Sequence, residues 1–347
     1  MVGAGMAGLV AAAQARELGA EVVVHEKLER AGGSMLLSSG VVWRHRDFAR
    51  FRSDCPGGDE GLQRLVFERL DADLEWLESM GAPVVARETG NELTAGVRFD
   101  PEGLTAALLG AAGEVRLEDP LAELGAGTPV VLATGGFAAN REMLAKHVTP
   151  HAAHVALRAA PGNAGDGLRL GLEAGGAASG GLGEIYGRNM PAPPARFGPT
   201  DYVGKAQLYA SHAEVTNEGG ERYEARTWSE IDVVQWTARQ PRARAWFRVP
   251  AAALGERVRD RTVAEMVDAA ESAGAPVRRE AGAVTVETIA GITSTLGGLA
   301  IDARARAAPG VFAAGDDAGG IATGGYASGL AAALVLGRVA ARSALGG

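Results

Sequence analysis

The hydrophobic positions of the chain follow two spacings, which predict a mixture of helices and buried strands. Between residues 61 and 80, leucines and a valine recur every three or four positions, as on a helix with one buried face. Short apolar runs at 129–133 and 311–314 are each followed closely by glycine, which is typical of buried strands. A longer apolar run, 330–345, predicts a final helix. We therefore expect an α/β fold.

The first 26 residues follow the order strand end, glycine turn, helix, strand and acidic residue. The glycines are spaced as in a turn that binds a dinucleotide. The next stretch is almost free of β-branched residues, so we expect a helix whose N-terminal N–H groups attract phosphate oxygens. The acid at the end of the second strand accepts ribose hydroxyls and repels a 2′-phosphate, which favours FAD or NAD over NADP. The expected contacts are Gly3, Gly5, Met6, Ala7, Gly8, Glu26 and Lys27.

This motif has an alternative explanation, because a chain with 50 glycines also contains ordinary Gly/Ala-rich helix starts. The flanking strands, the helix and the acid together favour the nucleotide-binding interpretation. Only Met1 and Val2 precede the turn, although such a turn normally follows a full central strand. We therefore expect the true start of the chain to lie upstream of Met1.

Further turns of small residues follow other predicted strands. Asp166 opens a helix, where it either caps that helix or bonds a cofactor, and the residues leave both readings open. Asp316 ends a second buried strand, remote in sequence, and can hold the other half of the same ligand. The helix that starts near Ser328 directs a positive dipole end toward the ligand. The contacts expected here are Gly32, Gly33, Ser34, Ser38, Gly40, Gly135, Gly136, Asp166, Asp316 and Ser328.

The composition of the chain changes near residue 181, where aromatic residues and prolines gather. Such a shift with Pro-rich edges marks a domain boundary. We expect a nucleotide-binding domain in two parts, 1–180 and 289–347, and a capping or substrate domain inserted at 181–288.

Charge and cysteine content exclude several kinds of partner. The net charge of −8 argues against nucleic acid and against an anionic membrane. The single Cys55 fits a reducing compartment, and no apolar run is long enough to span a membrane, so we expect a cytoplasmic protein with a small-molecule substrate. The histidines lack the spacing of a metal site, so no metal is expected.

At these residues the chain resembles the flavoprotein family of fumarate reductase flavoprotein subunits and 3-ketosteroid Δ1-dehydrogenases. The shared stretches occur in the family's order, and they are 3–8 with Glu26, 32–34, 133–137, 165–167, 295–299 and 314–316 with the final helix. The resemblance implies FAD in a Rossmann-like domain of the glutathione-reductase type, split by an α+β capping domain. It adds Val115, Ala133, Thr134, Gly298, Gly315, Gly329 and Leu330 to the expected FAD contacts.

The departures from the family pattern are informative. Members that bind flavin covalently carry a histidine near the ring, whereas 34–38 contains none, so we expect noncovalent FAD. Fumarate reductases hold their substrate with a histidine and an arginine, and the corresponding positions here are Ser294 and about Gly324. Dicarboxylate recognition normally uses arginine, so the loss of both anchors argues against fumarate and succinate.

The steroid dehydrogenases place a tyrosine just before the final helix, and Tyr326 matches that position. It is either a proton-handling residue or a packing residue of a glycine-rich loop, and both readings stay open. Tyr186, Arg188 and Arg226 are further catalytic candidates in the predicted capping domain, although such clusters also occur on salt-bridged surfaces.

The favoured function is an FAD-dependent oxidoreductase that transfers a hydride between flavin N5 and a C–C bond next to a carbonyl, with a ketosteroid-like substrate and an unknown electron acceptor. The alternatives are a fumarate-reductase-like enoate reductase and a flavin-binding protein without catalysis. A third interpretation is an NAD-dependent dehydrogenase. It gives no role to the second acid-tipped strand, that is, the second strand that ends in an acidic residue, Asp316.

Overall fold

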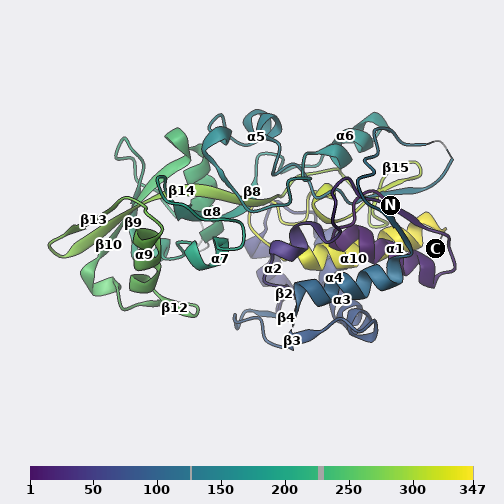
Figure 1. Cartoon of the computed structure of the whole chain (residues 1–347), viewed down its shortest axis with the longest axis horizontal. Coiled ribbons are helices and arrows are strands. Elements are labelled where there is room, and N and C mark those ends of the chain that lie inside the picture. The colour runs from purple at the N-terminus through teal and green to yellow at the C-terminus, as the bar shows by residue number, and fades with distance from the viewer. Residues whose placement is uncertain (126, 226–229, 347) are drawn as a thin grey trace. The chain divides into compact units, whose positions relative to one another are not determined.

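The computed structural model describes residues 1–125, 127–225 and 230–346 (Figure 1). The chain forms two compact units. The first consists of Met1–Asn140, Ala160–Glu184 and Ser294–Gly347, and the second of Arg141–Ala159 and Ile185–Thr293. The mixed α/β fold expected from the sequence is confirmed. That the second unit acts as a capping domain stays a prediction.

The central sheet of the first unit consists of the short strands β1 (Val23–His25), β5 (Glu114–Arg116), β6 (Val130–Leu132), β15 (Arg306–Ala308) and β16 (Val311–Ala313). The pairs β1–β5 and β6–β16 are parallel, whereas β15 adds antiparallel to β16. Val2 forms single parallel bridges to His25 and to Leu132, so it stands between the two pairs. The carboxyl ends of β1, β6 and β16 therefore lead into neighbouring turns.

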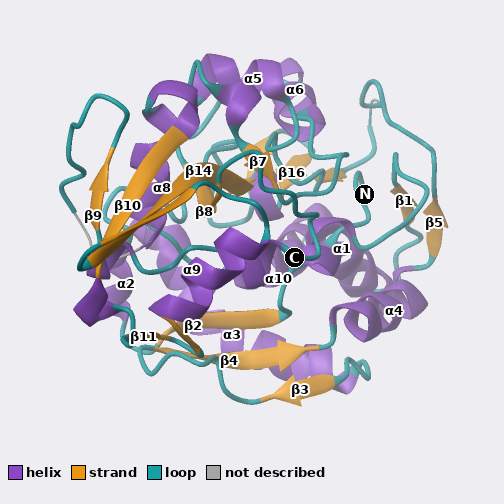
Figure 2. Ribbon diagram, turned by 60° about the vertical axis from the view of Figure 1, so that its left-hand side comes forward, coloured by secondary structure: helices purple, strands orange, loops and turns teal. Residues whose placement is uncertain are grey.

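Two helices, α1 (Met6–Glu17) and α10 (Gly329–Ala344), lie side by side in the first unit (Figures 1 and 2). Their close approach depends on small residues, because a Cβ on Gly337 would stand 2.7 Å from the carbonyl oxygen of Ala7. Likewise, a Cβ on Gly8 would stand 1.9 Å from the carbonyl oxygen of Gly3, so α1 packs directly on the turn before it.

The capping signals in the sequence mark the starts of two further helices, α3 (Glu60–Ser79) and α4 (Pro101–Ala112). Asp59 accepts a hydrogen bond from the N–H of Leu62, and Asp100 accepts one from the N–H of Gly103. The predicted helix at 61–80 is thereby confirmed.

A buried polar network joins α1, α3 and α10. Arg338 forms an ion pair with Asp73, and their side chains are only 9% and 4% exposed. Gln14 accepts a hydrogen bond from Nε of Arg338 at 2.7 Å, and the guanidinium lies 4.4 Å from the ring centre of Trp76. Burial raises the pKa of Asp73 and lowers that of Arg338, while each partner opposes the shift of the other.

Below these helices in Figure 2 lies an antiparallel sheet of β2 (Val41–His45), β4 (Thr94–Phe99) and β3 (Val84–Ala86). The short helix α2 (Phe48–Asp54) follows β2, and α6 (Asp166–Glu173) follows the turn at Gly165. β2 places Trp43 beside the loop that precedes α10, since the N–H of Trp43 lies 3.4 Å from Oγ of Ser328.

The second unit is built on the long strand β14 (Ala283–Thr295), which pairs with β10 (Arg244–Pro250) along seven positions. Its apolar core is centred on Tyr209, Phe247 and Met266. Thr262 and Glu265 form a capping box at the start of α9 (Val263–Ser272). The remaining elements are α5 (Arg141–His147), β7 (Ala156–Leu157), β8 (Ile185–Pro191), α7 (Tyr202–Lys205), β9 (Glu214–Thr216), α8 (Glu230–Arg239), β10 (Arg244–Pro250), β11 (Arg257–Val258), β12 (Arg261–Thr262), α9 (Val263–Ser272) and β13 (Val277–Glu280).

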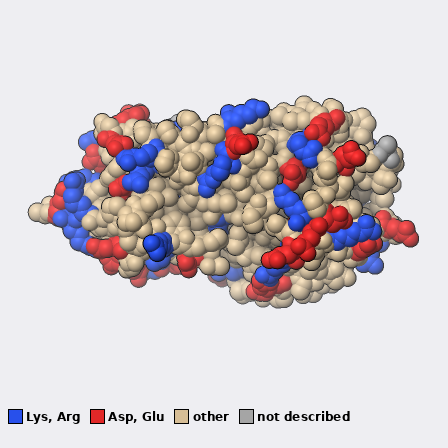
Figure 3. Space-filling model, turned by 45° about the horizontal axis from the view of Figure 1, so that its top comes forward, with Lys and Arg blue, Asp and Glu red and all other residues tan. Residues whose placement is uncertain are grey.

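Acidic and basic side chains are interspersed on the face drawn in Figure 3. Among the helices of the described residues, none combines the length and hydrophobicity that a bilayer span requires.

Candidate functional site

The first turn has the geometry that a dinucleotide requires. Gly3 has a φ of +100°, and Gly5 caps α1 in an extended conformation. A Cβ on Gly5 would meet no atom within 4 Å, so the space above the turn is open to a diphosphate. Gly32 and Gly33 border this turn, since Gly32 bridges to Gly5 and its N–H donates to the carbonyl oxygen of Ala4. The structure thus brings both predicted glycine segments together.

Glu26 is a buried carboxylate at the end of β1. Its Oε2 accepts a hydrogen bond from the N–H of Ala4 at 2.7 Å, and its Oε1 accepts one from the N–H of Leu28 at 2.9 Å. These bonds fix the carboxylate beside the glycine turn. The sequence motif predicts that the ribose binds at this point. Val115 lies on the neighbouring strand and pairs with Val24.

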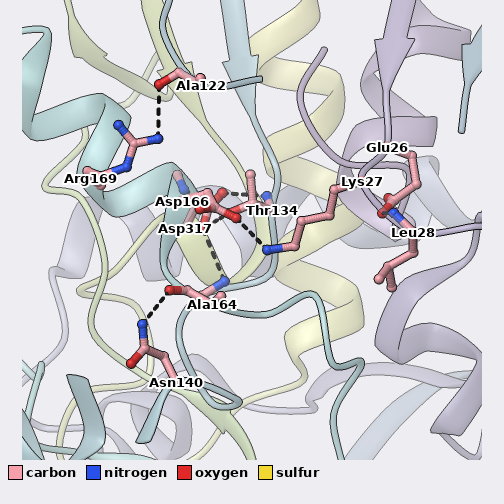
Figure 4. A network of polar contacts seen from close by, with 12 residues as sticks. Glu26, Lys27, Leu28, Ala122, Thr134, Asn140, Ala164, Asp166, Arg169 and Asp317 are labelled. Carbon is pink, nitrogen blue, oxygen red and sulfur yellow. Dashed lines mark hydrogen bonds and ion pairs between the residues drawn. The ribbon is translucent and has the colours of Figure 1, made fainter. Parts of the chain in front are cut away.

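Lys27 and Asp166 form an ion pair, with 2.5 Å between Nζ and Oδ2 (Figure 4). The pair links the end of β1 to the first residue of α6, and both side chains are roughly one-third exposed. Gly165, and not Asp166, is the N-cap of α6, and no side-chain cap bond is found there, so the capping alternative for Asp166 is wrong. That Asp166 contacts the cofactor stays a prediction.

The hydroxyl-bearing residues of the 32–40 loop have defined partners. Ser34 Oγ accepts hydrogen bonds from the N–H of Ala160 at 2.9 Å and from Nδ2 of Asn163 at 3.1 Å. Ser38 donates to the carbonyl oxygen of Met35 and accepts from the N–H of Gly40. Ser34 is therefore tied to the segment before α6, whereas Ser38 stabilises its own loop.

Asp317, which the sequence interpretation missed, organises the turn after β6. Its carboxylate accepts hydrogen bonds from the N–H of Thr134 at 2.5 Å, from the Thr134 hydroxyl at 3.0 Å and from the N–H of Gly136 at 3.0 Å. The Thr134 hydroxyl in turn accepts a hydrogen bond from the N–H of Gly167 at 2.9 Å. Burial raises the pKa of Asp317, and the three hydrogen bonds oppose that shift. This residue joins the predicted turns at Ala133–Gly136 and Asp166–Gly167.

Asp316 follows β16 and lies near the starts of α1 and α10. A Cβ on Gly315 would lie 3.1 Å from Cβ of Ala7, and a Cβ on Gly329 would lie 3.8 Å from Oδ1 of Asp316. Among the described residues, the Asp316 carboxylate has no hydrogen bond, although the side chain is partly buried. A partly buried carboxylate to which the described residues supply no donor fits a ligand that brings its own hydroxyl groups.

Burial, with a smaller contribution from Asp317, raises the pKa of Asp316 to about 7. The pKa of an unfolded aspartate is about 4, so between these two pH values the folded chain holds a proton that the unfolded chain has lost. We therefore expect the stability of the FAD-free protein to fall as the pH rises through this window. Asp316→Asn should flatten the fall, as measured by thermal unfolding at a series of pH values. Parallel pH profiles for the two proteins would contradict this assignment.

Two further predicted contacts lie at the start of α10 and beside it. Ser328 caps α10 by accepting a hydrogen bond from the N–H of Ala331 at 3.2 Å, so Gly329 and Leu330 open the helix. A Cβ on Gly298 would stand 2.5 Å from the carbonyl oxygen of Asp317, so Gly298 packs against the turn that follows β16.

The catalytic candidates divide between the units. Tyr326 lies in the first unit, next to α10, with its ring centre 5.7 Å from that of Trp43. Tyr186 and Arg188 lie together on β8 of the second unit, with the guanidinium 4.8 Å from the centre of the tyrosine ring. Arg226 lies outside the described residues.

Glu230, at the start of α8, is a partner of Arg188. Its Oε1 lies 3.9 Å from Nε of Arg188 and 2.5 Å from Nη2 of Arg259. Burial raises the pKa of Glu230, but the two arginines outweigh it and lower that pKa overall. An ionised carboxylate beside Arg188 reduces the net positive charge that Arg188 can offer to an anionic ligand.

Comparison with known proteins agrees with this geometry. Residues 118–330 match the family model described as an FAD binding domain, and residues 1–42 match that of an NAD(P)-binding Rossmann-like domain. Among curated proteins, none matches the chain significantly.

Solved structures of low sequence identity share the fold. A flavocytochrome c3 fumarate reductase in an open conformation is 21% identical, with a TM-score of 0.71 over 99% of this chain and 77% of that chain. A 3-ketosteroid-Δ4-(5α)-dehydrogenase from Rhodococcus jostii RHA1 is 19% identical, with a TM-score of 0.69 over 99% and 95%. A 3-ketosteroid Δ1-dehydrogenase from Sterolibacterium denitrificans is 16% identical, with a TM-score of 0.71 over 99% and 98%.

The family model covers well over half of the chain, so the expected cofactor, FAD, is confirmed at the level of the family. The two acid-tipped strands, the open space above Gly5 and the donor-free Asp316 carboxylate fit that cofactor. The chain belongs to the family of FAD binding domain proteins.

Proposed function

We propose that the chain is an FAD-dependent oxidoreductase that adds or removes two hydrogens across a C–C bond next to a carbonyl group. Bound FAD supplies the acceptor or donor of the hydride. The chain's own contribution is to hold the nucleotide with Glu26 and Asp316 and to move the accompanying proton with Tyr326. When hydrogens are removed, the Tyr326 phenolate accepts the proton from the carbon next to the one that loses hydride. When hydrogens are added, the phenol returns it.

The observation that carries this proposal is the position of Tyr326. It lies two residues before Ser328, the cap of α10, and Gly329 approaches the Asp316 carboxylate. A phenol at this point is close in sequence to residues at the proposed flavin site, and it has the chemistry to donate and accept a proton.

The substrate class that we propose is an uncharged cyclic ketone of the ketosteroid type. Two of the solved structures that share the fold contain such ligands, 4-androstene-3,17-dione and 1,4-androstadiene-3,17-dione. The Glu184 carboxylate accepts a hydrogen bond from the N–H of Gly324 at 2.6 Å, at the position where the family resemblance implies a carboxylate-binding arginine. A negative charge at this position disfavours a dicarboxylate.

One anaerobic experiment distinguishes the alternative substrates from one another and from a flavin-binding protein without catalysis. The FAD-loaded protein is mixed with 4-androstene-3,17-dione, and the photoreduced protein is mixed with cyclohexenone or with fumarate, while the visible flavin absorbance is followed. Bleaching by the steroid or reoxidation by the enone supports the proposal. Reoxidation by fumarate alone supports the enoate reductase, and a flavin that no substrate reduces or reoxidises supports a carrier without catalysis.

We also propose that FAD is held without a covalent bond, because the 34–38 stretch contains no histidine. Denaturation of the FAD-loaded protein in acid should release all of the flavin into the supernatant. Yellow colour that stays with the precipitated chain would show a covalent link.

A further inference from the structure

The loop that carries Tyr326 is held tightly by its own unit. A Cβ on Gly325 would stand 1.7 Å from the carbonyl oxygen of Asp54 and 3.2 Å from Sγ of Cys55, so the backbone of Gly325 rests directly on the end of α2. Real Cβ atoms do not approach so closely, so position 325 excludes any side chain.

Buried hydrogen bonds fasten the same loop further along. Gln63 is fully buried, and its Nε2 donates to the carbonyl oxygens of Cys55 at 2.9 Å and Ile321 at 2.8 Å. The N–H of Gly57 donates to the carbonyl oxygen of Thr323 at 3.0 Å. The backbone on the N-terminal side of Tyr326 is therefore fixed before any ligand binds.

The ring of Tyr326 projects from this fixed backbone and packs against Trp43. Their ring centres are 5.7 Å apart at an interplanar angle of 63°, which is an edge-to-face pair. The indole is itself held, because Trp43 packs edge-on against His45 at 5.3 Å. His45 stacks on Phe51 at 4.9 Å, and its Nε2 lies 3.2 Å from Oδ2 of Asp54.

These contacts form a closed path. It runs from Tyr326 through Trp43 and His45 to Asp54, whose carbonyl oxygen lies against Gly325. Every residue of the path belongs to the first unit. The Tyr326 ring is attached to a fixed backbone and packs against Trp43, so it has few orientations in the free protein. Little orientational freedom is therefore lost when a substrate binds.

We propose that Trp43 is a positioning residue for Tyr326. The inference rests on the proposed function, because Tyr326 is the residue that it serves. The indole of Trp43 touches the tyrosine ring and holds the phenol in the orientation for proton transfer. A small misplacement of such a group lowers turnover by roughly 10- to 100-fold, so loss of the indole should act on kcat more than on KM.

The first test does not need a substrate. The chain has five tyrosines, and Tyr326 is the one in the first unit, whereas Tyr186, Tyr202, Tyr209 and Tyr223 lie in the second. The FAD-loaded protein is labelled with 3-fluorotyrosine, and the Tyr326 fluorine resonance is assigned by its loss in Tyr326→Phe. Trp43→Leu should shift and broaden this resonance and leave the other four in place. Trp43→Phe, which keeps an aromatic ring, should shift it less.

The matched control is Trp76→Leu, which removes an indole that packs on Arg338 instead of on a tyrosine. It should leave the Tyr326 resonance unchanged. An unchanged Tyr326 resonance in Trp43→Leu would overturn the proposal. If Trp43→Leu does not fold, Trp43→Phe is tested by the same measurement. A change in the Tyr326 fluorine resonance alone supports the proposal, and an unchanged Tyr326 resonance overturns it.

The second test measures turnover of 4-androstene-3,17-dione with an artificial electron acceptor. Trp43→Leu should lower kcat by roughly 10- to 100-fold with little change in KM, and Trp43→Phe should restore much of it. In a Tyr326→Phe background, Trp43→Leu should cause almost no further loss of kcat. If the fluorine resonance moves but Tyr326→Phe keeps full turnover, the positioning role stands and the proposed function is wrong.

Discussion

Tyr326→Phe is expected to lower kcat by about 10²- to 10⁴-fold while FAD stays bound, because the variant removes only the phenolic oxygen that moves the proton. The ring and its contact with Trp43 remain, so the loop should keep its conformation. The measurement is steady-state turnover of 4-androstene-3,17-dione by the FAD-loaded protein, with flavin content determined from the visible absorbance of each preparation.

The control for this variant is Tyr209→Phe. It removes a phenol that donates to Oε1 of Gln207 at 2.8 Å in the core of the second unit. We expect lower thermal stability and nearly unchanged kcat per bound flavin. Full turnover by Tyr326→Phe with FAD bound would remove Tyr326 from the mechanism.

Asp73→Ala should produce the largest loss of stability. Arg338 would stay buried between α1, α3 and α10 without its carboxylate partner, and breaking such a buried pair costs about 3–5 kcal/mol. Gln14 still accepts from Nε of Arg338, but this single bond does not neutralise the charge. The measurement is the free energy of unfolding of the FAD-loaded protein in urea.

An exposed ion pair provides the comparison. Asp268 lies 3.0 Å from Nη2 of Arg279, and both side chains are at least half exposed. Asp268→Ala should cost no more than about 1 kcal/mol. Equal losses for Asp73→Ala and Asp268→Ala would contradict the role assigned to the buried network.

Local signals in the sequence predicted several elements of the first unit, among them α1, α3 and α10. The capping residues Asp59 and Asp100 lie next to the helices that they start, so the helix boundaries can be read from a few residues. The glycine turn and Glu26 are likewise close in sequence, and the spacing of their motif reflects a fixed strand–turn–helix geometry.

The residues that sequence reasoning missed act over long separations. Asp317 was hidden beside Asp316, because two adjacent carboxylates look alike until the structure shows which one faces the N–H groups of Thr134 and Gly136. The contact between Trp43 and Tyr326 joins residues 283 positions apart, and no pattern along the chain indicates it. The contact of Arg188 with Glu230 joins residues 42 positions apart, and no pattern along the chain indicates it either.

The account depends most on the claim that Glu26 and Asp316 hold opposite halves of one FAD molecule. A calorimetric titration of the FAD-free protein with FAD tests it most directly, with Glu26→Gln and Asp316→Asn titrated beside the unaltered chain. We expect one FAD per chain and weaker binding in both variants. ADP should distinguish them, because its affinity should fall in Glu26→Gln and stay unchanged in Asp316→Asn. Unaltered FAD affinity in both variants, or no FAD binding at all, would contradict the account.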